Sequence, residues 1–178
     1  MTCIVGIADK GHVTIGGDSA GVGGYDLRVR KDPKVFRNGP FLMGYTSSFR
    51  MGQLLRFAFT PPEHPKDMDI DRYMMTVWID AVRECFKAGG YAAKNSDRES
   101  GGVFLVGYQG RLFRIDDDFQ VGETVDGYDA CGCGDSFALG AMHATQGYPP
   151  LQRVRIALEA AERWSAGVRG PFTIDTQE

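Results

Sequence analysis

The chain opens with the stretch MTCIVGIADKGHVTIGGD, residues 1–18. Residues 2–8 are mostly apolar, which predicts a strand that is buried on both faces and is therefore central in its sheet. Residues 9–11 supply a turn, and residues 12–18 predict the return strand of a hairpin. The first residues of the chain are therefore expected to enter the core at once.

Beyond this hairpin the pattern alternates between further hairpins and pairs of helices. A glycine-rich, charged connection is expected over residues 19–34, and Asn38-Gly39 is a strong hairpin turn signal. The other expected elements follow from apolar periodicity and turn residues, and they are strands at 34–37 and 41–45, helices near 51–58 and 71–87, a hairpin at 101–115, a strand near 119–125, helices at 134–146 and 150–164, and a short strand at 171–174. Clustered hairpins and paired helices predict an α+β fold with two antiparallel sheets covered by two helical layers.

Composition limits the classes of protein to which the chain can belong. It has 178 residues, of which 43% are hydrophobic and 24% charged, and this fits one globular domain spanning residues 1–178. A net charge of −3 gives no basic footprint for nucleic acid. No apolar run reaches the roughly 18 residues of a membrane span. The four cysteines are irregularly spaced, which indicates a reducing cytoplasm rather than a disulfide framework.

Conventional catalytic and metal motifs are weak in this sequence. His12, His64 and His143 lie far apart and in unlike contexts. The pair Cys131-x-Cys133 lacks the second cysteine pair of a zinc site, and no G-x-S-x-G elbow is present. No metal ligand is therefore assigned from the sequence.

Thr2 is the exception, because it stands immediately before the first buried strand. Methionine that precedes a small residue is normally removed, which would give Thr2 a free α-amine as well as its hydroxyl. Such an amine titrates near about 7.7–8.0, so it can take the proton of the hydroxyl. Nucleophile and base would then belong to one residue. The alternative is that Thr2 merely begins a strand.

Several motifs occur together in a known order. They are TCIVGI at residues 2–7, GGD at 16–18, KV at 34–35 and, later, GCGDSFALG at 132–140. In this order they resemble the proteasome β-subunit superfamily of N-terminal-nucleophile hydrolases, and in motif most of all the HslV peptidases. The resemblance extends over residues 2–46 and 130–146, and between them only the order of elements matches. It implies a four-layer αββα sandwich with Thr2 as nucleophile, Asp18 as the carboxylate and Lys34 as the catalytic lysine.

Three positions depart from the family pattern. Ser47 stands where the family has a glycine whose backbone N–H forms the oxyanion hole, although a serine N–H can serve equally. Cys133 stands where the family has a serine near the terminal amine, and a thiol is a weaker donor. Residues 162–167 hold no clear counterpart of a family aspartate. Relatives can bind a monovalent or divalent cation through carbonyls near this helix end; no ligands are assigned here, and the chemistry requires no cofactor.

The resemblance also implies an activity and partners. The expected enzyme is a threonine-type endopeptidase that cleaves unfolded polypeptide inside a homo-oligomeric ring of roughly 12 or 14 subunits, fed by an ATP-dependent unfoldase. Two alternatives stay open: a small-molecule amidase of the same fold, and a catalytically silent ring subunit. Apolar side chains on the first pair of helices could supply ring contacts, namely Phe57, Phe59, Met74, Met75 and Trp78.

Overall fold

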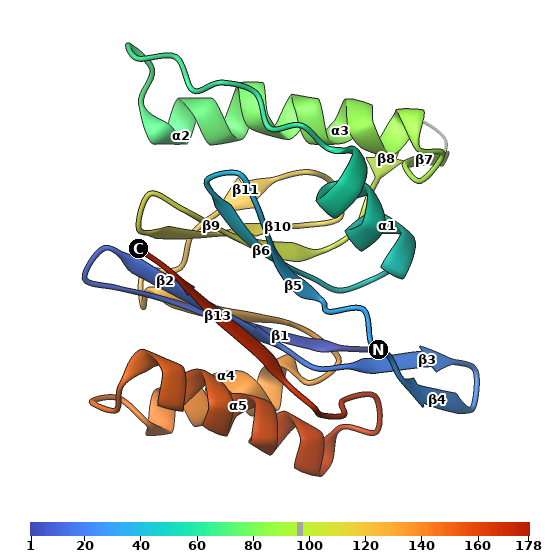
Figure 1. The fold of residues 1–178 in the computed structure, drawn as a ribbon, viewed down its shortest axis with the longest axis vertical. Coiled ribbons are helices and arrows are strands. Elements are labelled where there is room, and N and C mark those ends of the chain that lie inside the picture. Colours follow the sequence, from blue (N-terminus) through green and yellow to red (C-terminus); the bar gives the residue numbers. More distant parts are fainter. Residues whose placement is uncertain (96–97) are drawn as a thin grey trace.

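The computed structural model describes residues 1–95 and 98–178, which form four layers in the order helices, sheet, sheet, helices (Figure 1). The two sheets lie face to face in the middle, and one helical layer covers the outer face of each. The expected αββα sandwich is therefore confirmed.

The first sheet carries the N-terminal strand at its centre. Its strands run in the order β12-β1-β2-β13, all antiparallel. Strand β1 is flanked on both sides and its first five residues are buried, because nearly all of its side chains are apolar. The strands of this sheet are β1 (Cys3–Asp9), β2 (His12–Gly17), β12 (Tyr128–Gly132) and β13 (Thr173–Gln177).

The second sheet has the order β11-β10-β9-β6-β5. Its two hairpins follow the Asn38-Gly39 and Gln109-Gly110 turn signals, and both glycines adopt positive φ, +56° and +74°. The strands are β5 (Val35–Asn38), β6 (Phe41–Tyr45), β9 (Phe104–Tyr108), β10 (Arg111–Ile115) and β11 (Val121–Gly122). Eight buried apolar residues fill the space between the two sheets: Ile4, Val13, Ile15, Val35, Leu42, Leu105, Leu112 and Cys131.

The helices lie where the apolar periodicity predicts them. One layer contains α1 (Phe49–Gln53), the π-helical η1 (Leu54–Ala58), α2 (Ile70–Arg72), the π-helical η2 (Tyr73–Trp78) and α3 (Ile79–Ala88); the other contains α4 (Asp135–Ala144) and α5 (Pro150–Trp164). Helix α5 packs closely on β2 at Gly16, where a Cβ would lie 2.5 Å from Val154 Cγ1. In the described part of the chain no helix is long and apolar enough to cross a membrane.

One segment predicted as a connection, and one for which the sequence predicts no element, are strands in the structure. The region 19–34 contains a hairpin of β3 (Ala20–Gly23) and β4 (Asp26–Val29), which forms its own two-stranded sheet beside the N-terminus (Figure 1). Strand β12 was also missed, although it pairs with β1 from Cys3↔Gly132 to Ile7↔Tyr128. Strands β7 (Ala93–Asn95) and β8 (Arg98–Ser100) pair antiparallel in a further two-stranded sheet.

Only two of the five apolar side chains named as candidates for ring contacts are exposed. Phe57 is 77% exposed and Met75 is 49% exposed, as a ring contact would require. Phe59, Met74 and Trp78 are instead buried in the core between the first helical layer and its sheet.

Candidate active site

Thr2 lies at the end of a central strand and is almost fully buried, at 6% exposure. The register of β1 explains its neighbours, because Cys3 pairs with Gly132 on one side and Ile4 pairs with Gly17 on the other. The residues that follow these two partners, Cys133 and Asp18, are thereby brought to the same end of the sheet. Two motifs far apart in sequence thus meet at Thr2.

Lys34 joins the Thr2 hydroxyl to the Asp18 carboxylate. Its Nζ lies 2.6 Å from Thr2 Oγ1 and 2.8 Å from Asp18 Oδ1. The Lys34 and Asp18 side chains are 1% and 0% exposed, so this ion pair is removed from water. Burial lowers the pKa of Lys34, and the neighbouring Asp18 charge only partly opposes that effect.

The Asp18 carboxylate is held by backbone donors as well as by Lys34. Oδ1 accepts from the N–H of Cys3 at 3.1 Å, and Oδ2 accepts from those of Ala20 at 2.9 Å and Arg169 at 3.2 Å. Both oxygens are therefore satisfied, as a buried carboxylate requires. The contribution of Arg169, 151 residues further along the chain, gave no signal in the sequence.

Cys133 lies against the backbone of Thr2. The Thr2 N–H donates to Cys133 Sγ at 3.3 Å, and Sγ in turn contacts Ser165 Oγ at 3.3 Å. Ser165 follows α5 within the segment 162–167, where the sequence offered no clear aspartate counterpart. The structure places its hydroxyl next to Cys133, and Glu162 instead accepts from the Gly170 N–H at 2.8 Å.

Ser47 shares a small hollow of about 50 Å³ with Thr2 and Lys34. It adopts φ +60°, a conformation that favours glycine. Its hydroxyl accepts from the Val103 N–H at 3.0 Å, so the side chain is bound to the segment that leads into β9. Within residues 1–95 and 98–178 the Ser47 N–H has no acceptor, which leaves it available to a ligand in the hollow.

Met1 lines the same hollow as Thr2. Its carbonyl accepts the Thr2 hydroxyl at 2.5 Å, and the Thr2 nitrogen is an amide that cannot act as a base. Met1 is 57% exposed, whereas Thr2 beneath it is buried. Whatever precedes Thr2 must be removed before its amine can take part in chemistry.

The cation that the sequence resemblance implied has no ligand set that we can assign. Among the described residues no group of three or more His, Cys, Asp or Glu side chains is placed to hold a metal ion. Near the end of α5 the Ser165 carbonyl already accepts from the Val168 N–H, and the Arg169 carbonyl accepts from the Ser19 N–H.

The four-layer arrangement is the fold of the solved proteasome-like N-terminal-nucleophile hydrolases. Solved structures of that class superpose on nearly the whole chain. Thiobacillus denitrificans BPH in complex with epoxomicin matches with a TM-score of 0.83 and 21% identity, covering 99% of this chain and 98% of that one. Eukaryotic HslV from Trypanosoma brucei matches with a TM-score of 0.69 and 16% identity, covering 99% of each chain.

A third structure, Anbu (ancestral beta-subunit) from Yersinia bercovieri, gives a TM-score of 0.68 and 16% identity over 99% of this chain and 81% of that one. No family model and no curated protein sequence matches the chain. At these identities the structural matches show a common fold. They confirm the fold that the motif resemblance implies.

Proposed function

We propose that the chain, once Thr2 is its first residue, is a threonine-type N-terminal-nucleophile peptidase. The observation that carries the proposal is the buried Lys34 ammonium, bonded to both the Thr2 hydroxyl and Asp18. A cation 2.6 Å from the hydroxyl favours its alkoxide, and its charge also lowers the pKa of a neighbouring amine. Asp18 holds the ammonium in place and keeps it charged.

In this mechanism the neutral Thr2 amine accepts the hydroxyl proton as Oγ1 attacks the carbonyl carbon of the substrate. The Ser47 N–H donates to the oxyanion that forms. The intermediate collapses to a Thr2 ester when the scissile C–N bond breaks, and the leaving amine takes the proton from the Thr2 ammonium. Water, deprotonated by the same amine, then attacks the ester and regenerates the hydroxyl. Cys133 is proposed to position the amine.

Polypeptide is the substrate class that we propose, cleaved inside a homo-oligomeric ring in the cytoplasm with an ATP-dependent unfoldase. The structural relatives support this choice, since one holds epoxomicin and another is described as a beta-subunit. Large exposed apolar side chains on both helical layers support an assembly: Phe57, Met75, Phe137, Leu151 and Trp164. The amidase and the silent ring subunit are the competing functions.

Intact-mass measurement with and without epoxomicin tests the proposal. The purified protein is expected to lack Met1 and to gain the mass of one inhibitor molecule per chain, with the adduct mapped to Thr2. Thr2→Ala is expected to fold normally, to form no adduct and to cleave no peptide. Full activity of Thr2→Ala would exclude this mechanism, and an adduct without cleavage of casein-like polypeptide would favour the amidase.

A further inference from the structure

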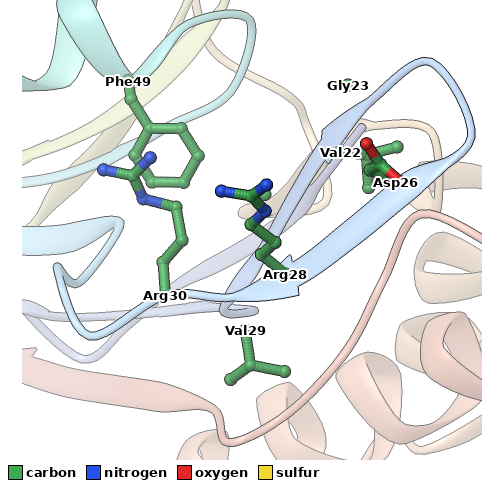
Figure 2. A pocket seen from close by; sticks show the side chains of 8 residues that line it. Val22, Gly23, Asp26, Arg28, Val29, Arg30 and Phe49 are labelled. Atoms are coloured by element: carbon green, nitrogen blue, oxygen red, sulfur yellow. The ribbon is translucent and has the colours of Figure 1, made fainter.

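A second hollow of about 490 Å³ adjoins the one that contains Thr2. It lies between the β3–β4 hairpin and Phe49 (Figure 2). Val22 and Phe49 line both hollows, so a chain bound at Thr2 can extend into this second hollow. The sequence alone does not reveal this hollow, because residues 19–34 are predicted to be a connection.

Strand alternation and two glycines create this hollow. Gly21 pairs with Arg28 and Gly23 with Asp26, so two positions without side chains lie opposite two charged ones. A Cβ at Gly21 would lie 2.7 Å from Arg30 Cδ. Glycine at this position therefore lets the Arg30 side chain pack against the strand, whereas nothing lies within 4 Å of a Cβ at Gly23.

The two arginines of the hollow differ in their partners. Arg30 is bound to both oxygens of Asp32, at 2.9 and 2.8 Å, and its guanidinium lies 3.9 Å from the centre of the Phe49 ring. Arg28 is exposed, and in the described part of the chain it has no ion pair and no hydrogen bond from its side chain. Its guanidinium lies between Arg30 and Asp26, on the side of the hairpin away from the Val29 side chain (Figure 2).

We propose that Arg28 selects substrates with an acidic side chain near the scissile bond. A free guanidinium presents a fork that matches a carboxylate with two hydrogen bonds, and the Arg30–Phe49 stack forms one wall beside it. Asp26 faces the hollow at the hairpin tip, so its charge confines an incoming carboxylate to the Arg28 end. The proposal rests on the proposed peptidase function and names its specificity.

Internally quenched peptides that differ only in Glu or Gln test this preference. One substitution is placed at each of three positions on either side of the cleavage site, and kcat/KM is measured at low salt. At one position the Glu peptide is expected to be about tenfold better, as a charge-assisted hydrogen bond allows. Arg28→Gln should bring this ratio close to one, and Asp26→Asn should raise it. Arg155→Gln, the same change at an exposed site on α5, should keep the wild-type ratio.

Binding to the Thr2→Ala protein separates the two proposals, because it needs no turnover. Fluorescence anisotropy is expected to show about tenfold tighter binding of the preferred Glu peptide than of its Gln partner, and Arg28→Gln should remove the difference. Equal affinities at every position would overturn the role of Arg28 even if the wild type cleaves all the peptides. If Thr2→Ala binds the Glu peptide more tightly but the wild type cleaves none of the peptides, Arg28 remains a specificity residue and the peptidase function is overturned.

Discussion

Gly102 and Ser47 form a matched pair at the edge of the candidate active site. A Cβ built on Gly102 would lie 2.9 Å from Ser47 Cβ, a separation that real side chains do not adopt. The Ser47 side chain, at φ +60°, therefore fits in its place because residue 102 has no side chain. A serine at residue 47, where the motif resemblance implies a glycine, is thus accommodated by the glycine at residue 102.

Gly102→Ala is expected to displace the Ser47 backbone and so to weaken the oxyanion site. We expect kcat to fall by about tenfold or more with a smaller change in KM, because loss of an oxyanion donor typically costs about 10²–10³ in kcat. Overpacking should also lower the free energy of unfolding by about 1–3 kcal/mol.

Two further variants control for this effect. Gly122→Ala adds the same methyl group where nothing lies within 4 Å, and it should change neither quantity. Ser47→Gly combined with Gly102→Ala should recover much of the lost kcat. Failure of that recovery would assign the effect to Met51 and Tyr91, which also lie within 3 Å of the added Cβ.

Lys34→Ala should abolish activity and also destabilise the fold. The change leaves the fully buried Asp18 carboxylate without its counter-ion, and breaking such a pair costs about 3–5 kcal/mol. Loss of a positioned proton-transfer group alone lowers the rate by about 10²–10⁴-fold. Lys34→Arg should not rescue, because the guanidinium has a different shape in a closed site.

Urea unfolding and peptide hydrolysis on the same preparations measure both effects. Thr2→Ala is the control, since it removes the nucleophile and leaves the ion pair intact. It should be inactive with nearly wild-type stability. A stable but inactive Lys34→Ala protein would show that the Asp18 charge is compensated in some other way. Asp18→Asn is expected to depress the rate without unfolding the protein.

The lowered pKa of Lys34 predicts opposite trends of activity and stability at alkaline pH. Between that lowered pKa and the ordinary value of about 10.4, the unfolded chain binds more protons than the folded one. The contribution of Lys34 to the free energy of unfolding therefore rises with pH in this window. Activity should fall in the same window, because the ammonium next to Thr2 Oγ1 is lost.

The measurement compares kcat/KM with urea unfolding over this alkaline window. Thr2→Ala should retain the rise of the free energy of unfolding with pH. Lys34→Met should lose the contribution of Lys34 to that rise. On the acid side, activity should rise with pH as the Thr2 amine becomes neutral. A rate that stays constant through the alkaline window would mean that Lys34 does not need its charge.

Cys133→Ala is expected to slow acylation, whereas Cys133→Ser should be neutral or mildly activating. The sulfur lies 3.3 Å from the Thr2 nitrogen, and a serine hydroxyl is a stronger hydrogen-bonding group there. Burst kinetics with an activated ester would isolate the acylation step. Cys85→Ala, at a half-buried thiol in the other helical layer, should leave the burst unchanged. If Cys133→Ala changes only stability, the residue serves packing alone.

The assembly state is predicted to be a closed ring of roughly 12 or 14 subunits. Light scattering after size-exclusion chromatography at micromolar concentration would give its mass. Phe57→Glu places a charge on an exposed apolar site of the first helical layer, and Trp164→Glu does the same in the second layer. At least one of the two variants should dissociate the ring. Val125→Glu, in an exposed loop, should not. A wild-type monomer or dimer would favour the amidase.

The sequence predicted those parts of the fold that follow from apolar periodicity. Strand β1 was recognisable as a continuous run of apolar residues, and the two helices of the second layer were recognisable from apolar residues at helical spacing. Strand β12 was not, since its sequence YDACG holds few residues that favour strands, and it is specified by pairing with β1. The β3–β4 hairpin was missed for a similar reason, because its glycines and charges are typical of loops.

The candidate site was predictable where the motifs name residues, and unpredictable where backbone atoms matter. Thr2, Asp18 and Lys34 were each expected from short motifs, and the structure brings them within hydrogen-bonding distance. The Arg169 N–H donates to Asp18, and Gly102 leaves room for the Ser47 side chain. Both contacts depend on how segments far apart in the sequence meet. A backbone group carries no side-chain signature, so a single sequence cannot reveal these contacts.

Strand β13 and the segment before it have a consequence for the timing of biosynthesis. Arg169 supplies a donor to Asp18, Ser19 binds the carbonyls of Arg169 and Pro171, and β13 borders β2. These contacts join residues 13–19 to residues 169–177, which are synthesised at least 150 positions later. A nascent chain can therefore fold its early hairpins but cannot complete the surroundings of Asp18. The surroundings of the candidate nucleophile are thus completed only once residues 169–177 have been synthesised and have joined the first sheet.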